Sequence, residues 1–496
     1  MADRKWTPQQ IKALEANGNL TVLSAAAGSG KTTVLVEKAL RILLDEENKT
    51  SADRLLIVTF SNASAKEFKN RIEKGINEAI KKNPDNAYIK SQKVALQKAD
   101  ISTIHSFCIK LARENFEQLD IAPDFTICDE AKALEIHEKA TDAAMEYGYE
   151  NPDFRRFVTL FGKSSQDKQI REFLGYMHQY FSALPFPEKR AEELCGMAQN
   201  GKFEDTEIYK YLWDDIGQRA EYIKYLIGRE KTLMYLGDVD SYKDGILANE
   251  KMVNMLCEAY KNNNVFLVKS IANEKPASLG RMKKGMGNEY SEAIKNVNRI
   301  FTKQLEELAE DIEYLDKERY SEDMAQTSAY IKAITDVFIF FSRKLLELKK
   351  AEKSFEFSDF EHFAVKLLID ENGSRTPVAK ALQQKYVKIM EDEFQDTSYV
   401  QDMIFKTIAT ENEANLFVVG DVKQSIYGFR KASPQILLEK RSRYYKDKNL
   451  GTTIVLPNNF RSEVNVIRGV NFLFERIFPS IVPQGAVYCP RPTSHS

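Results

Sequence analysis

The sequence predicts an α/β protein whose parallel sheet is interrupted by a large helical insertion. Short β-type runs alternate with helical runs over about the first 110 residues, which is the pattern of βαβ units. From about residue 125 to 350, apolar residues recur at helical spacing and strand signals are scarce. The β-type runs return after residue 385, so we expect the two ends of the chain to form one α/β domain around an all-α insertion.

The predicted sheet is assembled from short apolar runs near both ends of the chain. A strand at 20–25 enters a glycine-rich loop, and a helix follows at 34–44. Five more strands are predicted, at 54–60, 99–104, 385–393, 415–421 and 452–457. Within the insertion, Leu, Ile and Phe recur every three or four residues over 289–350, so we expect them to face a core.

The composition is that of a soluble globular protein of 496 residues, long enough for roughly three domains. No run approaches the ~20 apolar residues of a membrane span, and no apolar signal core opens the chain, so we expect a cytoplasmic protein without a membrane partner. The five cysteines form no CxxC pair, which argues against zinc or disulfide frameworks. With a net charge of −2, any nucleic-acid partner must be held by a local surface.

The segment "SAAAGSGKTT" at 24–33 has the pattern of a phosphate-binding loop between a strand and a helix. Gly28 and Gly30 permit the tight backbone path, Lys31 would reach the β- and γ-phosphates of a nucleotide, and the Thr32 hydroxyl would ligate Mg²⁺. The strict pattern has Gly where this chain has Ala25, which disfavours a generic GTPase or kinase. The expected nucleotide-binding residues of the loop are Ala25, Ala26, Ala27, Gly28, Ser29, Gly30, Lys31, Thr32 and Thr33.

The acidic run "MEDEFQDTSYVQ" at 390–401 supplies the second half of such a site. Asp392 follows an apolar strand and would bind the metal ion, and Glu393 would position or deprotonate the attacking water. Gln395 and Asp396 could pass the nucleotide state onward. Taken alone, the run could equally be the acidic start of a solvated helix. Because one sheet must bring Lys31 and Asp392 together, the helical middle is expected to be an insertion into an ATPase domain.

These segments form an ordered set that resembles the motifs of superfamily 1 DNA helicases. The set is "AAAGSGKT", "TFSNASAKEFKNRI" (59–72), "STIHSFC" (102–108), "DEFQDTSYVQ" (392–401), "VVGDVKQSIYGFRKA" (418–432) and "LPNNFRS" (456–462). Within that group the sequence is most similar to the AddA family, the A subunits of AddAB helicase–nucleases. The similarity includes "WTPQQ" near the start, "YFSALPFP" (180–187) and "FEFSDFEHFA" (355–364).

The resemblance assigns roles around ATP. It implies that Gln10 reads adenine, although Thr7 to Gln10 also form a helix capping box, and both interpretations stay open. Gln424 would sense the γ-phosphate, and Arg461 would contact it from the next domain. Phe460 could stack on adenine or belong to a core. Glu393, Lys31, Gln424 and Arg461 are thus the expected catalytic residues.

The resemblance also implies a groove for single-stranded DNA. The expected contacts are Thr59, Phe60, Asn62, Thr103, His105, Ser106, Tyr427, Phe429 and Arg430. Phe60 and Phe429 could equally lie in the core, and no second metal ligand stands near His105 in the sequence. In the basic stretch 275–287, Arg281, Lys283 and Lys284 could touch duplex DNA, but a solvated loop is the favoured interpretation.

The domain organisation implied by the resemblance is a RecA-like P-loop domain, at 1–120 and 351–450, interrupted by a helical domain at 121–350. Residues 451–478 would start a second RecA-like domain, and 479–496 would be a disordered tail. The expected protein is an ATP- and Mg²⁺-dependent 3′–5′ DNA helicase for double-strand break repair, acting at junctions of single strand and duplex with an AddB-like partner subunit. Because the resemblance ends near residue 478, we expect little ATPase and no nuclease activity from this polypeptide.

Two alternatives remain open from the sequence. The chain could be a truncated UvrD/Rep-type helicase without a nuclease. It could also be a non-enzymatic module that binds DNA or AddB with a vestigial ATP site, although every expected phosphate and metal residue of the first domain is present.

Overall fold

The computed structural model describes residues 6–162, 166–200, 202–282, 287–447 and 450–481. The chain divides into two compact units. Unit 1 comprises residues 1–149, 161–190 and 337–496, and unit 2 comprises residues 150–160 and 191–336. The insertion predicted at 121–350 thus contributes residues 121–149, 161–190 and 337–350 to unit 1 and its remaining residues to unit 2.

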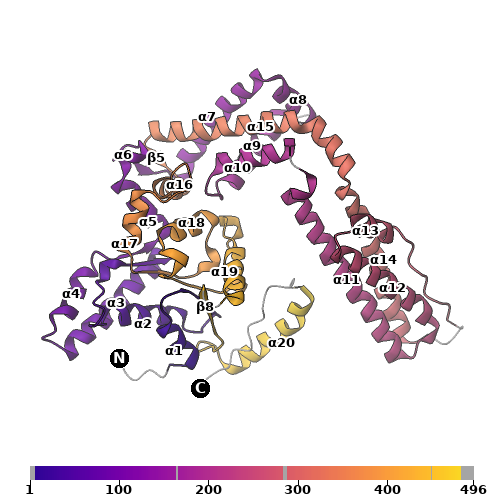
Figure 1. The fold of residues 1–496 in the computed structure, drawn as a ribbon, viewed down its shortest axis with the longest axis horizontal. Coiled ribbons are helices and arrows are strands. Elements are labelled where there is room, and N and C mark those ends of the chain that lie inside the picture. The colour runs from indigo at the N-terminus through magenta and orange to yellow at the C-terminus, as the bar shows by residue number, and fades with distance from the viewer. Residues whose placement is uncertain (1–5, 163–165, 201, 283–286, 448–449, 482–496) are drawn as a thin grey trace. The chain divides into compact units, whose positions relative to one another are not determined.

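Unit 1 is built on a six-stranded parallel sheet, which confirms the predicted fold class (Figure 1). Its strands lie in the order β3-β2-β6-β7-β1-β8. Strands β6 and β7, which follow the insertion in the chain, lie between β2 and β1, which precede it. The two ends of the chain therefore complete a single sheet. The strands span Leu20–Ala25 (β1), Leu55–Thr59 (β2), Asp100–Thr103 (β3), Lys388–Glu391 (β6), Leu416–Gly420 (β7) and Gly451–Leu456 (β8).

Helices cover both faces of this sheet because successive strand residues point to opposite sides. Leu55 and Ile57 share one buried apolar cluster with α2 (Lys31–Leu43) and α3 (Asn62–Lys82). Leu56 and Val58 share the other cluster with α5 (Ile104–Glu114), α16 (Phe357–Leu368) and α18 (Tyr399–Ile408). The remaining helices of this region are α1 (Pro8–Glu15), α4 (Ala87–Ala95), α6 (Phe116–Leu119), α17 (Pro377–Lys385) and α19 (Pro434–Lys446).

The segment expected to open a second domain at 451–478 begins with β8, which pairs in parallel with β1 along its full length. Helix α20 (Val464–Ile481) follows and extends beyond residue 478. Residues 482–496, most of the predicted tail, lie outside the described residues. Unit 1 also contains α7 (Glu130–Glu150), α9 (Gln166–Phe181) and a two-stranded sheet of β4 (Thr126–Ile127) and β5 (Ser354–Phe355).

Unit 2 is helical, as the spacing of apolar residues in the insertion predicts. Helix α11 (Glu207–Gly237) packs against α12 (Lys243–Lys261) and α14 (Glu289–Asp311). The buried residues of α14 recur at spacings of three and four, which confirms the predicted core face: Ile294, Val297, Phe301, Leu305 and Leu308. Helix α13 (Val265–Ala272) also lies in unit 2, and α8 (Pro152–Phe161), α10 (Pro187–Asn200) and α15 (Lys317–Ala351) contribute residues to both units.

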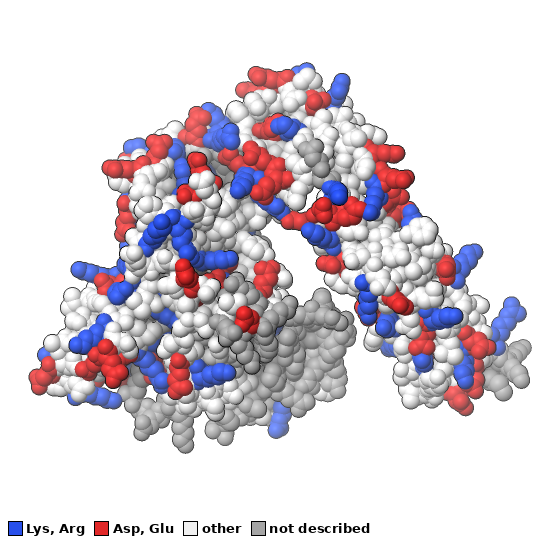
Figure 2. All heavy atoms as spheres, in the orientation of Figure 1, with Lys and Arg blue, Asp and Glu red and all other residues white. Residues whose placement is uncertain are grey.

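The surface charge on the face drawn in Figure 2 does not indicate a particular partner. On the face drawn in Figure 2, acidic and basic side chains are interspersed in both units. Arg281 of the basic stretch is exposed, whereas Lys283 and Lys284 lie outside the described residues. Across the described part of the chain, no helix is long and apolar enough to cross a membrane.

Candidate active site

The glycine-rich loop joins the carboxyl end of β1 to the first turn of α2. Gly28 and Gly30 have positive φ angles of 73° and 84°, a region that residues with a Cβ atom rarely adopt. Gly30 is the N-cap of α2 and gives no side-chain cap, so the first amide groups of the helix are left for another acceptor. Backbone N–H groups at a helix N-terminus favour an anion, which fits a phosphate-binding loop.

Lys31 at the start of α2 meets the acidic segment that follows β6. Its Nζ lies 2.8 Å from Glu393 Oε2, although the two residues are 362 positions apart in the chain. Glu393 has a left-handed backbone with φ 55°, which is uncommon for a residue with a side chain. Gln395 donates from Nε2 to the same Glu393 oxygen at 2.9 Å. The sheet thus brings the two predicted halves of the site into contact.

Negative charge is in excess around Lys31. Burial and the neighbouring Glu393 carboxylate raise the pKa of Asp392 to about 6, although Lys31 opposes this. Burial and Glu393 also raise the pKa of Asp396 to about 6, and its Oδ1 lacks a hydrogen-bond partner among the described residues. A divalent cation would relieve this repulsion between carboxylates.

Asp421 extends the network away from the loop. Its backbone N–H donates to Gln395 Oε1 at 2.9 Å, and Gln424 donates from Nε2 to Asp421 Oδ2 at 2.8 Å. Hydrogen bonds therefore run without a break from Lys31 to Gln424. Sequence reasoning did not single out Asp421, although it follows the apolar strand β7 as Asp392 follows β6.

Gln10 performs the capping role and also touches the phosphate loop. It forms the capping box of α1 with Thr7, and its Nε2 donates to the Ser29 carbonyl at 3.3 Å. One amide hydrogen and one lone pair remain for a ligand. Helix α1 is anchored by Lys38, whose Nζ donates to Leu14 O, Ala16 O and Asn17 Oδ1 at 2.7, 2.6 and 3.0 Å. Burial lowers the pKa of Lys38 to about 8.

The turn after β8 lies against the phosphate loop. The Phe460 amide donates to the Gly28 carbonyl at 2.8 Å, and a Cβ atom at Gly28 would come within 2.8 Å of Arg461 Cβ. Asn459 Oδ1 accepts from the amides of Arg461 and Ser462, which fixes this turn. Arg461 therefore belongs to unit 1 here, beside the loop, and the Phe460 ring is half exposed.

Four residues predicted to contact DNA form a surface cluster, the aromatic–arginine cluster: Phe60, Tyr427, Phe429 and Arg430. The Phe60 and Tyr427 rings stack at 4.7 Å, and the Tyr427 and Phe429 rings lie 5.8 Å apart. The Arg430 guanidinium lies 5.2 to 5.9 Å from the three rings. Phe60 is 41% exposed and Phe429 is 72% exposed, so neither is a core residue.

Comparison with known proteins decides the family. Residues 6–445 match the family described as "UvrD/REP helicase N-terminal domain". The chain belongs to the UvrD/REP helicase family. Since that match spans most of the 496 residues, it covers the phosphate loop, the acidic segment and the aromatic–arginine cluster together.

Curated relatives of this UvrD/REP-family chain share one description: each is the A subunit of an "ATP-dependent helicase/nuclease". The relative from Clostridium novyi is 32% identical over 96% of this chain, and those from Thermoanaerobacter pseudethanolicus and Staphylococcus carnosus are 33% identical over 95% and 96%. These matches cover 39%, 39% and 40% of the relatives. The chain thus spans about 40% of the length of these proteins.

The other residues predicted to contact DNA in this UvrD/REP-family chain lie at the carboxyl ends of β2 and β3. Thr59 ends β2 and is buried, and Asn62 begins α3. Thr103 ends β3 and caps α5 through the Ser106 amide, so both hydroxyls already serve the helix start.

His105 of the UvrD/REP-family chain lies next to those caps. Its Nε2 is 3.2 Å from Glu361 Oε1, which also accepts from Gln401 Nε2 at 2.7 Å. Sequence reasoning missed Glu361, because its partners come from two other helices. Within the described residues no group of three or more His, Cys, Asp or Glu could hold a metal ion.

Proposed function

We propose that this chain is the ATP-hydrolysing motor portion of a 3′–5′ DNA helicase of the AddA type, acting in double-strand break repair. The observation that carries the proposal is the contact of Lys31 with Glu393, continued by hydrogen bonds through Gln395 and Asp421 to Gln424. These groups are what ATP hydrolysis requires: a cation for the phosphates, a base for water and a polar sensor.

ATP with Mg²⁺ fits the residues present. The positive-φ glycines and the uncapped start of α2 suit the phosphates, with Lys31 beside them. Thr32 and Asp392 would hold Mg²⁺, which would supply charge neutralisation of the phosphates. A dedicated cage of protein ligands is not needed, because Mg²⁺ typically takes one or two protein ligands plus phosphate oxygens and water. Gln10 and Phe460 would contact the base, and the rest of the 25–33 loop would enclose the phosphates.

The chemical roles follow from the contacts. When the phosphates draw Lys31 away, Glu393 becomes free to orient a water and accept its proton. Gln424 and Arg461 would contact the γ-phosphate, Gln424 from its bond to Asp421 and Arg461 from the turn beside Gly28. Both Lys31 and Gln424 must leave their carboxylate partners before they can contact phosphate, so we propose that the 496-residue polypeptide hydrolyses ATP slowly.

Single-stranded DNA is the proposed polymer substrate. The aromatic–arginine cluster offers exposed rings for base stacking and a cation for phosphate, which is the chemistry of sequence-independent strand binding. Asn62, His105 and Ser106 stand at the same edge of the sheet and would extend the contact, whereas Thr59 and Thr103 are buried there and would shape that edge. Since the relatives are described as A subunits of a helicase/nuclease, an AddB-like second subunit is the proposed protein partner.

The test is nucleotide binding and turnover by the purified polypeptide. We expect Lys31→Ala to weaken binding of a fluorescent ATP analogue at least tenfold, because it removes the phosphate-contacting cation. Glu393→Gln should retain binding of the analogue and lower the rate of ATP hydrolysis at least a hundredfold relative to wild type. The matched control is Glu37→Gln, a half-buried carboxylate on α2 that pairs with Arg41 and not with the phosphate loop. Unchanged analogue affinity in Lys31→Ala would instead favour a vestigial ATP site.

A further inference from the structure

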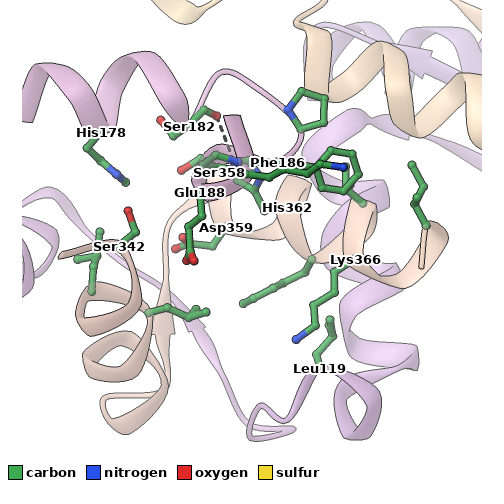
Figure 3. A pocket seen from close by; sticks show the side chains of 18 of the residues that line it. Leu119, His178, Ser182, Phe186, Glu188, Ser342, Ser358, Asp359, His362 and Lys366 are labelled. Carbon is green, nitrogen blue, oxygen red and sulfur yellow. Dashed lines mark hydrogen bonds between the residues drawn. The ribbon is translucent and has the colours of Figure 1, made fainter. Parts of the chain in front are cut away.

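A cavity of about 450 Å³ lies in unit 1, and none of its lining residues belongs to the phosphate loop (Figure 3). One wall is the turn between α9 and α10, and another is α16. These walls come from the segments "YFSALPFP" and "FEFSDFEHFA", which stand out in the sequence but supply nothing to the ATP site. Small-molecule sites typically have volumes of about 300–1,000 Å³, a range that includes this cavity.

The body of the cavity is apolar. Its walls include two aromatic rings, a proline ring and branched aliphatic side chains: Pro185, Phe186, Leu345, Leu346, Phe363 and Ile369. Such a lining stabilises a ligand by removing apolar surface from water and disfavours one whose body is charged.

Hydrogen-bonding groups without partners line the same space. Among the described residues, no hydrogen bond is formed by the ring nitrogens of His178 or by the hydroxyls of Ser342 and Ser358, and Figure 3 shows all three around the cavity. Burial and the nearby His137 lower the pKa of His178 to about 3, so its ring is neutral and has one donor and one acceptor. These groups can bind a polar, uncharged substituent.

The ionised groups of the lining are already neutralised. Asp359 is paired with Lys349 at 2.8 Å, and Glu188 is paired with Arg343 at 2.9 Å. Lys350 is paired with Asp120 at 2.9 Å. The other charged lining residues are exposed and balance in sign: Lys189, Lys366, Asp370 and Glu371. The cavity therefore presents no net charge for an ionic ligand.

Ser182, another residue that lines the cavity, is held in place by contacts from two other segments. His362 Nε2 lies 3.1 Å from the Ser182 carbonyl, and Lys431 donates to the Ser182 hydroxyl. A site fixed in this way loses little conformational entropy on binding, which favours affinity.

We propose that this cavity is a binding site for an uncharged aromatic small molecule that carries one hydrogen-bonding group. The ring would lie among the apolar walls, and the polar substituent would meet His178 and Ser342. This site is separate from ATP binding and does not depend on the proposed function.

The experiment uses the 496-residue chain and four probes of similar size: indole and benzamide, which are neutral, and benzoate and benzylammonium, which are charged. In ligand-observed NMR titrations, the neutral probes should bind with at least tenfold higher affinity than the charged ones. Ser342→Phe, which fills the cavity, should weaken indole binding at least tenfold, whereas Ser91→Phe on the exposed surface of α4 should not. Equal binding of charged and neutral probes, or no effect of Ser342→Phe, would overturn the proposal.

A second variant keeps the test valid if Ser342→Phe does not fold. Ser342→Cys is nearly isosteric and places a thiol at the cavity. Indole should slow maleimide alkylation of this thiol at least fivefold and leave the partly exposed Cys128 unaffected as an internal reference. Equal alkylation rates with and without indole would refute the site.

Discussion

Glu230 lies in α11 inside the core of unit 2, with both carboxylate oxygens lacking a hydrogen-bond partner among the described residues. Burial raises its pKa to about 7, and the neighbouring Asn298 opposes this shift. For an acid with a raised folded-state pKa, the unfolded chain ionises first. The stability of unit 2 therefore falls as pH rises from about 4.5 to 7, by up to about 3 kcal/mol.

Glu230→Gln removes this penalty while keeping the side-chain shape. We expect the variant to unfold at higher denaturant than wild type at pH 8, with a gain of about 1–3 kcal/mol, because no charge is then buried. At pH 5 the wild-type carboxyl is neutral when folded, so the difference should shrink to below about 1 kcal/mol. Urea unfolding followed by circular dichroism at both pH values is the measurement, and an equal gain at pH 5 and pH 8 would contradict it.

Lys38 is a residue whose role sequence reasoning could not reveal. Its chain position, on α2 between buried apolar residues, says only that the side chain points inward. Its three acceptors belong to α1 and the turn after it. Which oxygens lie within reach of the Lys38 ammonium depends on how α1 packs against α2. Glu361 was missed for a similar reason, since it joins side chains from α5 and α18, whereas Asp421 could have been found from its place directly after β7.

At the level of elements, the positions of individual strands and helix starts were predictable because they are encoded in consecutive residues. The strands β1, β2 and β3 coincide with apolar runs, and the start of α2 coincides with the end of the glycine loop. The order of strands in the sheet was not available from such runs. That order depends on how the strands after the insertion pair with the strands before it. Because β8 pairs with β1, the turn that carries Arg461 lies beside Gly28.

Helix α1 provides a prediction at this scale. Lys38→Met removes the donors that fix the end of α1, so Gln10 should lose its fixed position against the Ser29 carbonyl. We expect affinity for a fluorescent ATP analogue to fall about three- to tenfold, which corresponds to removing about one or two hydrogen bonds. Lys12→Met, on the exposed face of the same helix, is the control. Fluorescence titration should separate the two variants, and equal affinities would show that the anchor does not matter for the nucleotide.

Across the whole molecule, a net charge of −2 leaves little general attraction for DNA. Binding of a single strand must then depend on local groups such as the aromatic–arginine cluster, and salt should weaken it only modestly. Two substitutions in the cluster separate the contributions of stacking and of charge to the proposed strand binding.

Arg430→Ala should make the negative slope of log affinity against log salt shallower by about 0.7, the value for removing one phosphate interaction on a single strand. Phe429→Ala should leave the slope unchanged and weaken binding about 5- to 150-fold, the equivalent of ~1–3 kcal/mol for one stacked base. Arg299→Ala, an exposed charge on α14 of unit 2, is the matched control. Fluorescence anisotropy with a labelled oligonucleotide at several salt concentrations measures both effects, and identical slopes for all three variants would rule out a phosphate interaction at Arg430.

The position of β1 between β7 and β8 has a consequence for how the protein is made. Strand β1 ends at residue 25, whereas its first partner, β7, begins at Leu416. At a synthesis rate of about 5–20 residues per second, β1 waits roughly 20–80 s on the ribosome before a neighbour exists. An unpaired apolar strand can pair with the wrong chain during that time. Nascent chains stalled before residue 416 should therefore contain a protease-resistant unit 2 while the N-terminal segment is still digested.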